Sequence, residues 1–364
     1  MEGDLIKVNN WLTPFSWLYG IGVRFRNWLF DIGILKQQSF SIPVISVGNI
    51  TVGGCGKTPH VEYLINLLKD EYKVAVLSRG YKRKSSGYVL AEENTTMPQI
   101  GDEPFQMKEK FHDIYVSVDK NRRRGITQLI KDNRTSDVEV ILLDDAYQHR
   151  YVKPGMNILL VDYHRIIIND KLLPAGRLRE PKVAKERADI VIITKCPNSL
   201  KPIDFRVLKK ALDLRPYQKL YFTSIEYKPL VSFGKDKKIG LNEISKYENV
   251  LLLSGIASPK QIEKDLKPLC KNLKTIAFSD HHQFTVSDID KINKDFSSMK
   301  GAKIIVTTEK DLARLTHLKD LPVTFTDNLY FLPIEIEFKH KKDIDFNNNI
   351  RDYIRKTAYH HKGD

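Results

Sequence analysis

The sequence predicts an α/β fold in which a mostly parallel sheet carries helices on both faces, followed by a second, smaller α/β domain. Three observations support this prediction. From residue 42 onward, short and nearly continuous apolar runs alternate with helical patterns, as in parallel sheets buried on both faces. The first apolar run leads into a glycine-rich loop, which places a ligand at the carboxyl ends of the strands. A second alternating series begins after residue 215, beyond the polar stretch LRPYQK.

The first segment of the chain is rich in tryptophan, and we expect an amphipathic helix within residues 1–35. All three tryptophans, Trp11, Trp17 and Trp28, lie there. An aromatic, apolar face with arginines nearby is typical of a helix in a membrane interface, although a helix packed on the protein's own core fits the same pattern. The expected apolar face comprises Leu18, Ile21, Gly22, Phe25, Trp28, Leu29 and Ile32. The opposite face comprises Gly20, Arg24, Asn27 and Asp31.

The remaining elements follow from apolar runs and turn signals. In a core domain at residues 36–218 we expect strands at 42–47, 73–77, 114–118, 138–143, 157–161 and 189–194, with helices at 58–69, 104–111 and 119–131. In a smaller domain at residues 219–338 we expect strands at 250–253, 274–277, 303–306 and 329–332, and a helix that Ser258 caps. The charged tail at residues 339–364 is expected to form one exposed helix.

Composition indicates a soluble globular protein of 364 residues, with 41% hydrophobic and 29% charged residues. Cys55, Cys196 and Cys270 show no CxxC spacing, so we expect neither a zinc site nor a disulfide framework, but a reducing cytoplasm. We expect no signal peptide, because MEGDLIK lacks a basic region before an apolar core. The uncharged run at residues 8–23 is too short and polar to span a bilayer. The net charge of +14 favours anionic partners: nucleic acid, phosphorylated substrates or an acidic membrane surface.

The stretch ISVGNITVGGCGKTPH has the layout of a phosphate-binding loop: a strand, a glycine loop, Lys57-Thr58 and a helix. The usual pattern, G-x-x-x-x-G-K-[ST], has a glycine where this chain has Thr51. The other glycines still let backbone N–H groups converge on phosphate oxygens. Lys57 would bridge the β- and γ-phosphates, the Thr58 hydroxyl would bind Mg²⁺, and Cys55 is a small filler. We expect ATP at Thr51, Val52, Gly53, Gly54, Cys55, Gly56, Lys57 and Thr58.

A phosphate-binding loop needs a carboxylate for its metal, and the stretch VEVILLDDAYQHR supplies two. Its apolar strand ends in Asp144-Asp145, the placement of a Walker B site. Two acids at the end of a buried strand can also serve simply to cap the following loop, without binding a metal. Because the glycine loop is present, metal coordination is the better interpretation.

Other clusters are weak signals when taken singly. The stretch GDEP places Asp102 ahead of a helix, GRLREP contains Arg179 and Glu180, and FSDHHQF contains His281. An acid before a helix is more often an N-cap than a catalyst. Adjacent histidines more often lie on a surface. Only the order of these clusters along the chain makes them informative.

Taken in order, VGNITVGGCGKTP, LSRGY, GDEP, LDDAYQH, LPAGRLREP, ITKCP, SGIASP, FSDHH and VTTEKD resemble the tetraacyldisaccharide 4'-kinase family of lipid A biosynthesis. The resemblance extends from about residue 10 to about residue 335, and that family also has a non-glycine residue where Thr51 stands. It implies a P-loop NTPase-like fold and ATP-dependent phosphorylation of the 4'-hydroxyl of tetraacyldisaccharide 1-phosphate, giving lipid IVA. It also implies a peripheral enzyme on the cytoplasmic face of the inner membrane, and we expect a monomer.

The resemblance also implies roles for single residues. Lys57 and Thr58 hold ATP and Mg²⁺, and Asp144, Asp145 and Glu180 lie around the metal. Such parts suit phosphoryl transfer, which depends mostly on alignment and charge neutralisation.

The same resemblance assigns the acceptor side of the reaction. Asp102 is the base for the sugar hydroxyl, His281 of the second domain is its partner, and Arg179 lies near the phosphates. A sugar hydroxyl needs a proton acceptor within hydrogen-bond reach, which an aspartate oriented by a histidine provides. The chain has Ala146-Tyr147 where a Gly-Phe pair is common in the family.

Two other functions fit part of the sequence. A P-loop ATPase that couples hydrolysis to a conformational change explains the loop and Asp144, but it leaves GDEP, FSDHH and the tryptophan-rich helix without a role. A nucleic-acid-binding module would depend on the charge and on the run DKNRRRG. That run lacks interleaved aromatic residues and a docking motif, so we expect no nucleic-acid partner.

Overall fold

The chain divides into two compact units. Unit 1 comprises residues 1–100, 107–225 and 336–364, and unit 2 comprises residues 101–106 and 226–335. The computed structural model of the protein describes residues 8–235, 237–256, 259–280, 282–316, 318 and 321–360. Ser258, the expected helix cap, lies outside them.

Unit 1 is built on a sheet that is parallel along most of its width. The order of its strands in the described chain is β15-β8-β7-β6-β1-β5-β2-β4-β3. Parallel pairing joins β1 to β5 and β6, β2 to β4 and β5, and β7 to β6 and β8, whereas β3 is antiparallel to β4. The strands are β1 Val44–Gly48, β2 Val74–Ser78, β3 Val89–Leu90, β4 Tyr115–Val118, β5 Val140–Asp144, β6 Met156–Asp162, β7 Ile190–Thr194, β8 Lys219–Tyr227 and β15 Ile334–Phe338.

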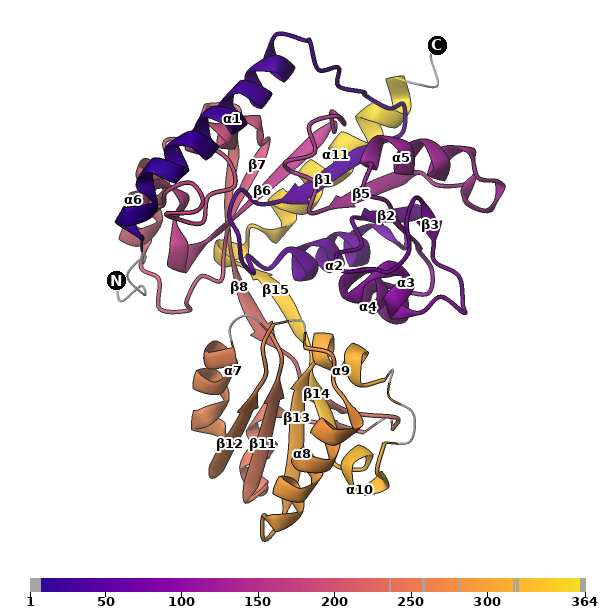
Figure 1. Cartoon of the computed structure of the whole chain (residues 1–364), viewed down its shortest axis with the longest axis vertical. Helices are drawn as coiled ribbons and strands as arrows, with labels where there is room; N and C mark the ends of the chain where they lie inside the picture. The colour runs from indigo at the N-terminus through magenta and orange to yellow at the C-terminus, as the bar shows by residue number, and fades with distance from the viewer. Residues whose placement is uncertain are drawn as a thin grey trace. The chain divides into compact units, whose positions relative to one another are not determined.

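Helices cover both faces of this sheet, which confirms the predicted fold class (Figure 1). Alternate residues of each strand point to opposite faces, so β5 contributes Val140 and Leu142 to the core under α2 and α11. Ile141 and Leu143 of the same strand pack under α5, and α6 packs on β6 and β7. The helices of unit 1 are α1 Thr13–Asp31, α2 Lys57–Leu68, α3 Met97–Ile100, α5 Arg122–Lys131, α6 Pro202–Leu212 and α11 Asp343–His360, while α4 Asp102–Lys110 begins in the segment assigned to unit 2.

Unit 2 contains a smaller mixed sheet, with order β10-β9-β14-β13-β11-β12 in the described chain. Strands β11, β12, β13 and β14 are parallel, and β9 is antiparallel to β14 and β10. Its strands are β9 Leu230–Ser232, β10 Lys238–Ile239, β11 Asn249–Ser254, β12 Asn272–Ala277, β13 Lys303–Thr308 and β14 Leu329–Leu332. Its helices are α7 Pro259–Leu266, α8 Val286–Ser298, α9 Glu309–Leu315 and α10 Val323–Thr326. Short 3-10 helices in the chain lie at Asn10–Leu12, Asn133–Thr135, Tyr163–Arg165, Ile167–Asn169, Lys182–Arg187, Leu241–Lys246, Lys267–Leu269 and Lys339–Lys341.

The prediction of an exposed tail helix is wrong. Helix α11 belongs to unit 1, and Phe346, Ile350 and Ile354 are 2%, 0% and 1% exposed in the core that α2 also enters. These three residues recur every four positions and form one apolar stripe. Most of the residues between them are polar or charged, so the composition of the segment indicates an exposed helix although the spacing of its apolar residues does not.

Helix α1 exposes the apolar face that the sequence indicates. Trp17, Leu18 and Ile21 are 75%, 76% and 57% exposed, while Ser16, Gly20 and Phe30 are buried. The alternative in which this apolar face packs on the protein's own core is therefore wrong, because the helix packs on unit 1 by its opposite side, through Ser16, Gly20 and Phe30. Among the described residues, no helix has the length and apolar character needed to span a membrane.

The burial of α11 leads to a stability prediction. Ile350→Ala should lower the free energy of unfolding by roughly 2–5 kcal/mol, the usual loss for truncating a buried aliphatic side chain. The measurement is urea-induced unfolding followed by circular dichroism. Ile344→Ala, on the same helix at a side chain that is 66% exposed, is the control and should have little effect. Equal losses in the two variants would contradict the packing described for α11.

Candidate active site

The glycine loop links β1 to α2 and has an unusual backbone. Gly53 and Gly56 have φ values of +118° and +78°, which side chains with a Cβ rarely adopt. Gly56 is also the N-cap of α2, so the amino-terminal end of that helix dipole faces the loop. This backbone can present N–H groups to an anion at the carboxyl edge of the sheet.

The predicted ATP-binding residues of the loop do not all face outward. Thr51 is buried, and its hydroxyl lies 3.2 Å from the Cys55 sulfur, which also accepts a hydrogen bond from Asn49 at 2.8 Å. The Val52 N–H donates to the Arg177 carbonyl at 2.7 Å. Thr51 and Cys55 therefore brace the loop from inside, whereas Val52 is held by its backbone and is 41% exposed. Their ATP contacts stay a prediction.

His60 anchors the end of the glycine loop to β8 through both of its ring nitrogens. Its Nδ1 lies 2.7 Å from the Gly56 carbonyl oxygen and its Nε2 lies 3.1 Å from the Thr223 hydroxyl of β8. A carbonyl can only accept, so Nδ1 carries the proton and Nε2 accepts from Thr223. Burial lowers the pKa of His60 to about 4, although the bond to Gly56 opposes this shift. The imidazole is therefore neutral at physiological pH and locks the turn that precedes Lys57.

Lys57, Asp145 and Arg179 come together in front of the loop. The Lys57 Nζ lies 3.6 Å from an Asp145 carboxylate oxygen, and the Arg179 Nη1 lies 3.4 Å from the same carboxylate. Burial acts to raise the pKa of Asp145, but Lys57, Arg179 and Arg122 outweigh it and hold this pKa below its usual value. All three side chains stay partly accessible. The structure thus gathers two cations and one anion where the sequence predicts phosphate and metal.

The two aspartates at the end of β5 have different surroundings. Asp144 is fully buried and accepts a hydrogen bond from Ser78 at 3.1 Å. Asp145 is more exposed and has a φ of +47°, a strained conformation for a residue other than glycine. The strained backbone turns the Asp145 side chain away from the strand and towards Lys57.

A buried arginine supports this strained turn, and the sequence analysis did not identify it. Arg122 is 2% exposed and donates to the carbonyl oxygens of Asp119 at 2.8 Å and Asp144 at 3.0 Å. Burial lowers the pKa of Arg122 to about 10, with Asp144 and Asp145 opposing the shift, so it stays charged at neutral pH. Arg122 belongs to the run DKNRRRG, in which Arg124 pairs with Asp119 at 2.7 Å. Two of the three arginines of this run thus have structural roles.

Glu180 is buried and has hydrogen-bond partners other than Asp144 and Asp145. It is 1% exposed, and its two oxygens accept from Arg187 at 2.5 Å and Asn27 at 3.2 Å. Arg187 also lies over the ring of Tyr147. Within the described ranges, no three His, Cys, Asp or Glu side chains gather closely enough to hold a metal ion. The structure therefore does not bring Glu180 into one ligand set with Asp144 and Asp145.

A smaller ligand set is still suitable for Mg²⁺. This ion is usually held by one or two carboxylates together with substrate phosphates and water. Thr58, in the first turn of α2, and the aspartates at the end of β5 supply oxygen donors of this kind. The donors present therefore fit the metal, and Asp145 is the more accessible of the two carboxylates.

Asp102, the predicted base, lies in the segment assigned to unit 2. Both Nε and Nη2 of Arg314 contact one carboxylate oxygen of Asp102, at 2.9 and 2.8 Å. Arg314 is itself fully buried and donates to Asp311 and to the Gly255 carbonyl, each at 2.9 Å. The sequence analysis missed Arg314, although Asp311 and Arg314 at helical spacing were a possible signal. His281 lies outside the described residues.

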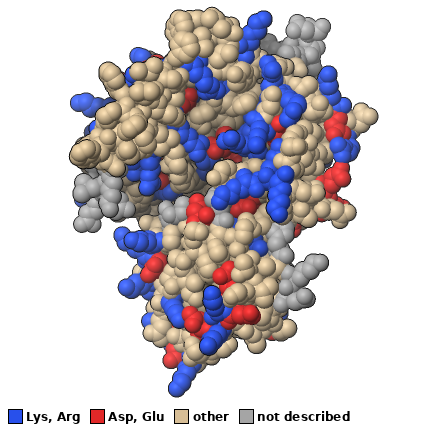
Figure 2. Space-filling model, viewed as in Figure 1, with Lys and Arg blue, Asp and Glu red and all other residues tan. Residues whose placement is uncertain are grey.

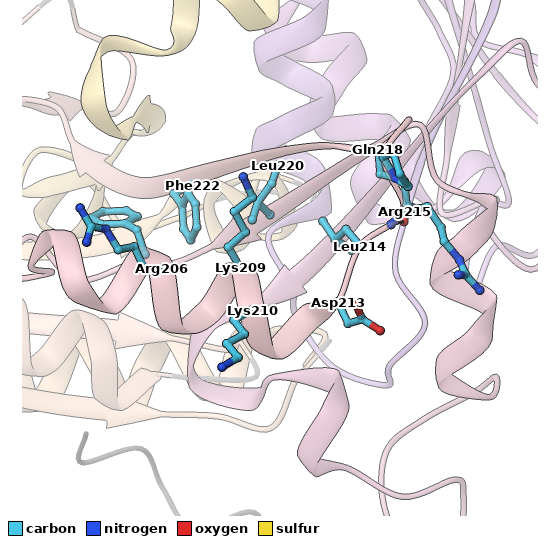
Figure 3. Close-up of a pocket in the computed structure, with 11 residues that line it drawn as sticks. Arg206, Lys209, Lys210, Asp213, Leu214, Arg215, Gln218, Leu220 and Phe222 are labelled. Carbon is cyan, nitrogen blue, oxygen red and sulfur yellow. Dashed lines mark hydrogen bonds between the residues drawn. The ribbon is translucent and has the colours of Figure 1, made fainter.

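A hollow of about 710 Å³ lies elsewhere in unit 1, between α6 and β8 (Figure 3). In Figure 3 the Lys209 side chain reaches from α6 towards β8, whereas the side chains of Lys210 and Asp213 point away from β8. None of the predicted site residues lines this hollow. It therefore plays no part in the assignment of the site.

The depressed pKa of His60 predicts a pH-dependent stability. Its pKa is about 4 when folded and 6.5 in the reference state, so the unfolded chain binds the proton more readily between these values. Stability from this group is complete above about pH 6.5 and falls on acidification, by roughly 2 kcal/mol between pH 7 and pH 5. Urea titrations of the wild type and His60→Gln, which cannot titrate, should therefore converge as the pH falls. A constant difference between them would contradict this role.

Comparisons with known proteins agree with this geometry. The model of the family described as Tetraacyldisaccharide-1-P 4'-kinase matches residues 8–354. A tetraacyldisaccharide 4'-kinase of Phocaeicola vulgatus is 55% identical over 362 residues, covering 98% of each chain. One from Bacteroides fragilis is 50% identical over 363 residues, covering 98% of this chain and 96% of its relative.

A solved structure gives the same result. The crystal structure of LpxK from Aquifex aeolicus, described as an "apo" form in complex with ATP, matches with a TM-score of 0.72 and 30% identity. The match covers 95% of this chain and 99% of that one. With the family model covering most of the chain and relatives at half identity or more, the chain belongs to the tetraacyldisaccharide-1-P 4'-kinase family.

Proposed function

We propose that the protein transfers the γ-phosphoryl group of ATP to the 4'-hydroxyl of tetraacyldisaccharide 1-phosphate, giving lipid IVA. The observation that carries this proposal is the Lys57–Asp145–Arg179 cluster in front of a glycine loop. The family match over residues 8–354 supplies the lipid disaccharide as the acceptor. Both features are needed, because the cluster alone fits any nucleotide-dependent phosphotransferase.

On the donor side, the loop and the charged side chains bind the triphosphate. Lys57 bridges the β- and γ-phosphates, and Arg179 faces the charge that spreads over the transferred group. Thr58, Asp144 and Asp145 would hold Mg²⁺, which would supply further charge neutralisation. The support for these roles is the partial exposure of Lys57, Asp145 and Arg179 beside the α2 terminus.

On the acceptor side, Asp102 takes the proton of the 4'-hydroxyl. The hydroxyl oxygen attacks the γ-phosphorus, the bond to the β–γ bridging oxygen breaks, and ADP leaves with that electron pair. Arg314 holds the carboxylate oxygen that it contacts at 2.8–2.9 Å, so the orientation of Asp102 is fixed. His281 is the proposed partner of Asp102 in this step.

The acceptor carries acyl chains, so the protein should work at a membrane surface. The exposed face of α1, with Trp17, Trp28 and their aliphatic neighbours, suits the interface of a bilayer, and the exposed Trp11 lies just before this helix. Figure 2 shows an uncharged surface over α1 and Lys and Arg side chains gathered on the viewed face of unit 1. The net charge of +14 would favour anionic lipids. We therefore propose peripheral binding to the cytoplasmic face of the inner membrane.

Transfer of label from γ-labelled ATP to the disaccharide acceptor in detergent micelles tests the function directly. ATP turnover should depend on the acceptor, and the label should appear in the lipid. ATP hydrolysis that ignores the acceptor would instead favour an ATPase that couples hydrolysis to a conformational change.

Lys57→Ala should reduce the rate of transfer by at least ~10²–10³, the scale for removing one preorganised charge-stabilising group. Folding should survive, because the lysine amine is directed at Asp145 near the surface. Lys69→Ala, at the other end of α2 and beside Asp70, is the matched control and should retain its rate. A Lys57→Ala enzyme with a near wild-type rate would refute the phosphate-loop assignment.

A further inference from the structure

Helix α1 has a second side that is fixed to unit 1. The Ser16 hydroxyl donates to the Leu172 carbonyl at 2.9 Å and accepts from the Ala175 N–H at 2.9 Å. Gly20 lies so close to Leu172 that a Cβ there would come within 2.8 Å of its side chain. The side of α1 opposite its tryptophan face is therefore seated on the loop that leads to Arg179.

Two further contacts reach the predicted site residues themselves. The Tyr19 hydroxyl donates to the Arg179 carbonyl at 2.8 Å, and the Arg179 N–H donates to the Ile50 carbonyl at 2.8 Å. The Arg179 backbone is thus held between α1 and the entry of the glycine loop. Asn27 donates to the Glu180 carboxylate at 3.2 Å. Burial of a carboxylate that is 1% exposed costs free energy unless it is paired and hydrogen-bonded, and Asn27 supplies one of these hydrogen bonds.

The same helix also holds the loop that follows Asp145. Arg26 donates to the Gln148 carbonyl at 3.2 Å. Arg150 donates to the Asn27 carbonyl at 3.0 Å and pairs with Asp31 at 2.6 Å. The helix therefore touches both loops that flank the Lys57–Asp145–Arg179 cluster.

We propose that Tyr19 and Asn27 are positioning residues for phosphoryl transfer, so that α1 is a working part of the site as well as a membrane contact. Tyr19 fixes the backbone from which the Arg179 guanidinium reaches Asp145. Asn27 completes the buried environment of Glu180, the next residue. This inference rests on the proposed role of Arg179 in the proposed function.

The test uses Tyr19→Phe, which removes one hydroxyl, and Asn27→Leu, which removes the amide at similar volume. Each should lower kcat by about three- to tenfold, the effect of losing one hydrogen bond. Affinity for ATP and sedimentation with phosphatidylglycerol–phosphatidylethanolamine vesicles should stay unchanged. Gly22→Ala is the control on the same helix, because a Cβ there meets nothing within 4 Å. This variant should retain the wild-type kcat.

A double-mutant cycle separates positioning from a general loss of structure. If Tyr19 acts through Arg179, Tyr19→Phe should cause no further loss in an Arg179→Ala background. Two results would overturn the inference: a wild-type kcat in both single variants, or losses in kcat that add fully in the double variant. In either case a slow Arg179→Ala enzyme would leave the proposed role of Arg179 intact. An enzyme without acceptor-dependent transfer would overturn the proposed function itself.

Discussion

The site depends on one carboxylate shared by two cations. Asp145 lies between Lys57 and Arg179, at 3.6 and 3.4 Å, and each of the three residues comes from a different part of unit 1. The start of α2, the end of β5 and the loop after Gly176 must therefore meet at one point. A parallel sheet provides this point, because the carboxyl ends of β1 and β5 lie side by side at one edge.

Most of the surrounding contacts keep these three side chains in place. His60 holds the turn before Lys57, Arg122 holds the carbonyl of Asp144, and Tyr19 holds the carbonyl of Arg179. Each donates to a backbone carbonyl, so each acts on the chain path rather than on the reacting groups. The strained φ of Asp145 can persist because such contacts surround it. Rigid support of this kind is what phosphoryl transfer by alignment requires.

The sequence predicted the elements whose signals are local. The strand–loop–helix around Lys57 and the two acids at the end of β5 follow from short-range patterns, and both are present in the structure. The supporting residues could not be predicted, because their partners are distant in sequence. Asn27 and Glu180 are 153 positions apart, and Arg314 and Asp102 are 212 positions apart. Only the topology brings such pairs together.

Charge was the least reliable guide. It marked α11 as an exposed helix, although Phe346 and Ile350 are buried. It also marked DKNRRRG as a candidate for nucleic acid, although Arg122 is buried and Arg124 is paired. In both segments a few residues at helical spacing decide the packing, and the charged majority does not. By contrast, the tryptophan-rich face of α1 is where the sequence analysis placed it, since no neighbouring element in the described chain covers it.

The central claim is that Asp145 stands where the nucleotide and its metal bind, and titration calorimetry with Asp145→Asn tests it most directly. Without Mg²⁺, ATP should bind this variant at least about fivefold more tightly than the wild type, because one negative charge near the triphosphate is gone. The gain in affinity that Mg²⁺ gives the wild type should be largely lost. An Asp145→Asn protein that keeps the full Mg²⁺-dependent gain would contradict the account and place the metal elsewhere.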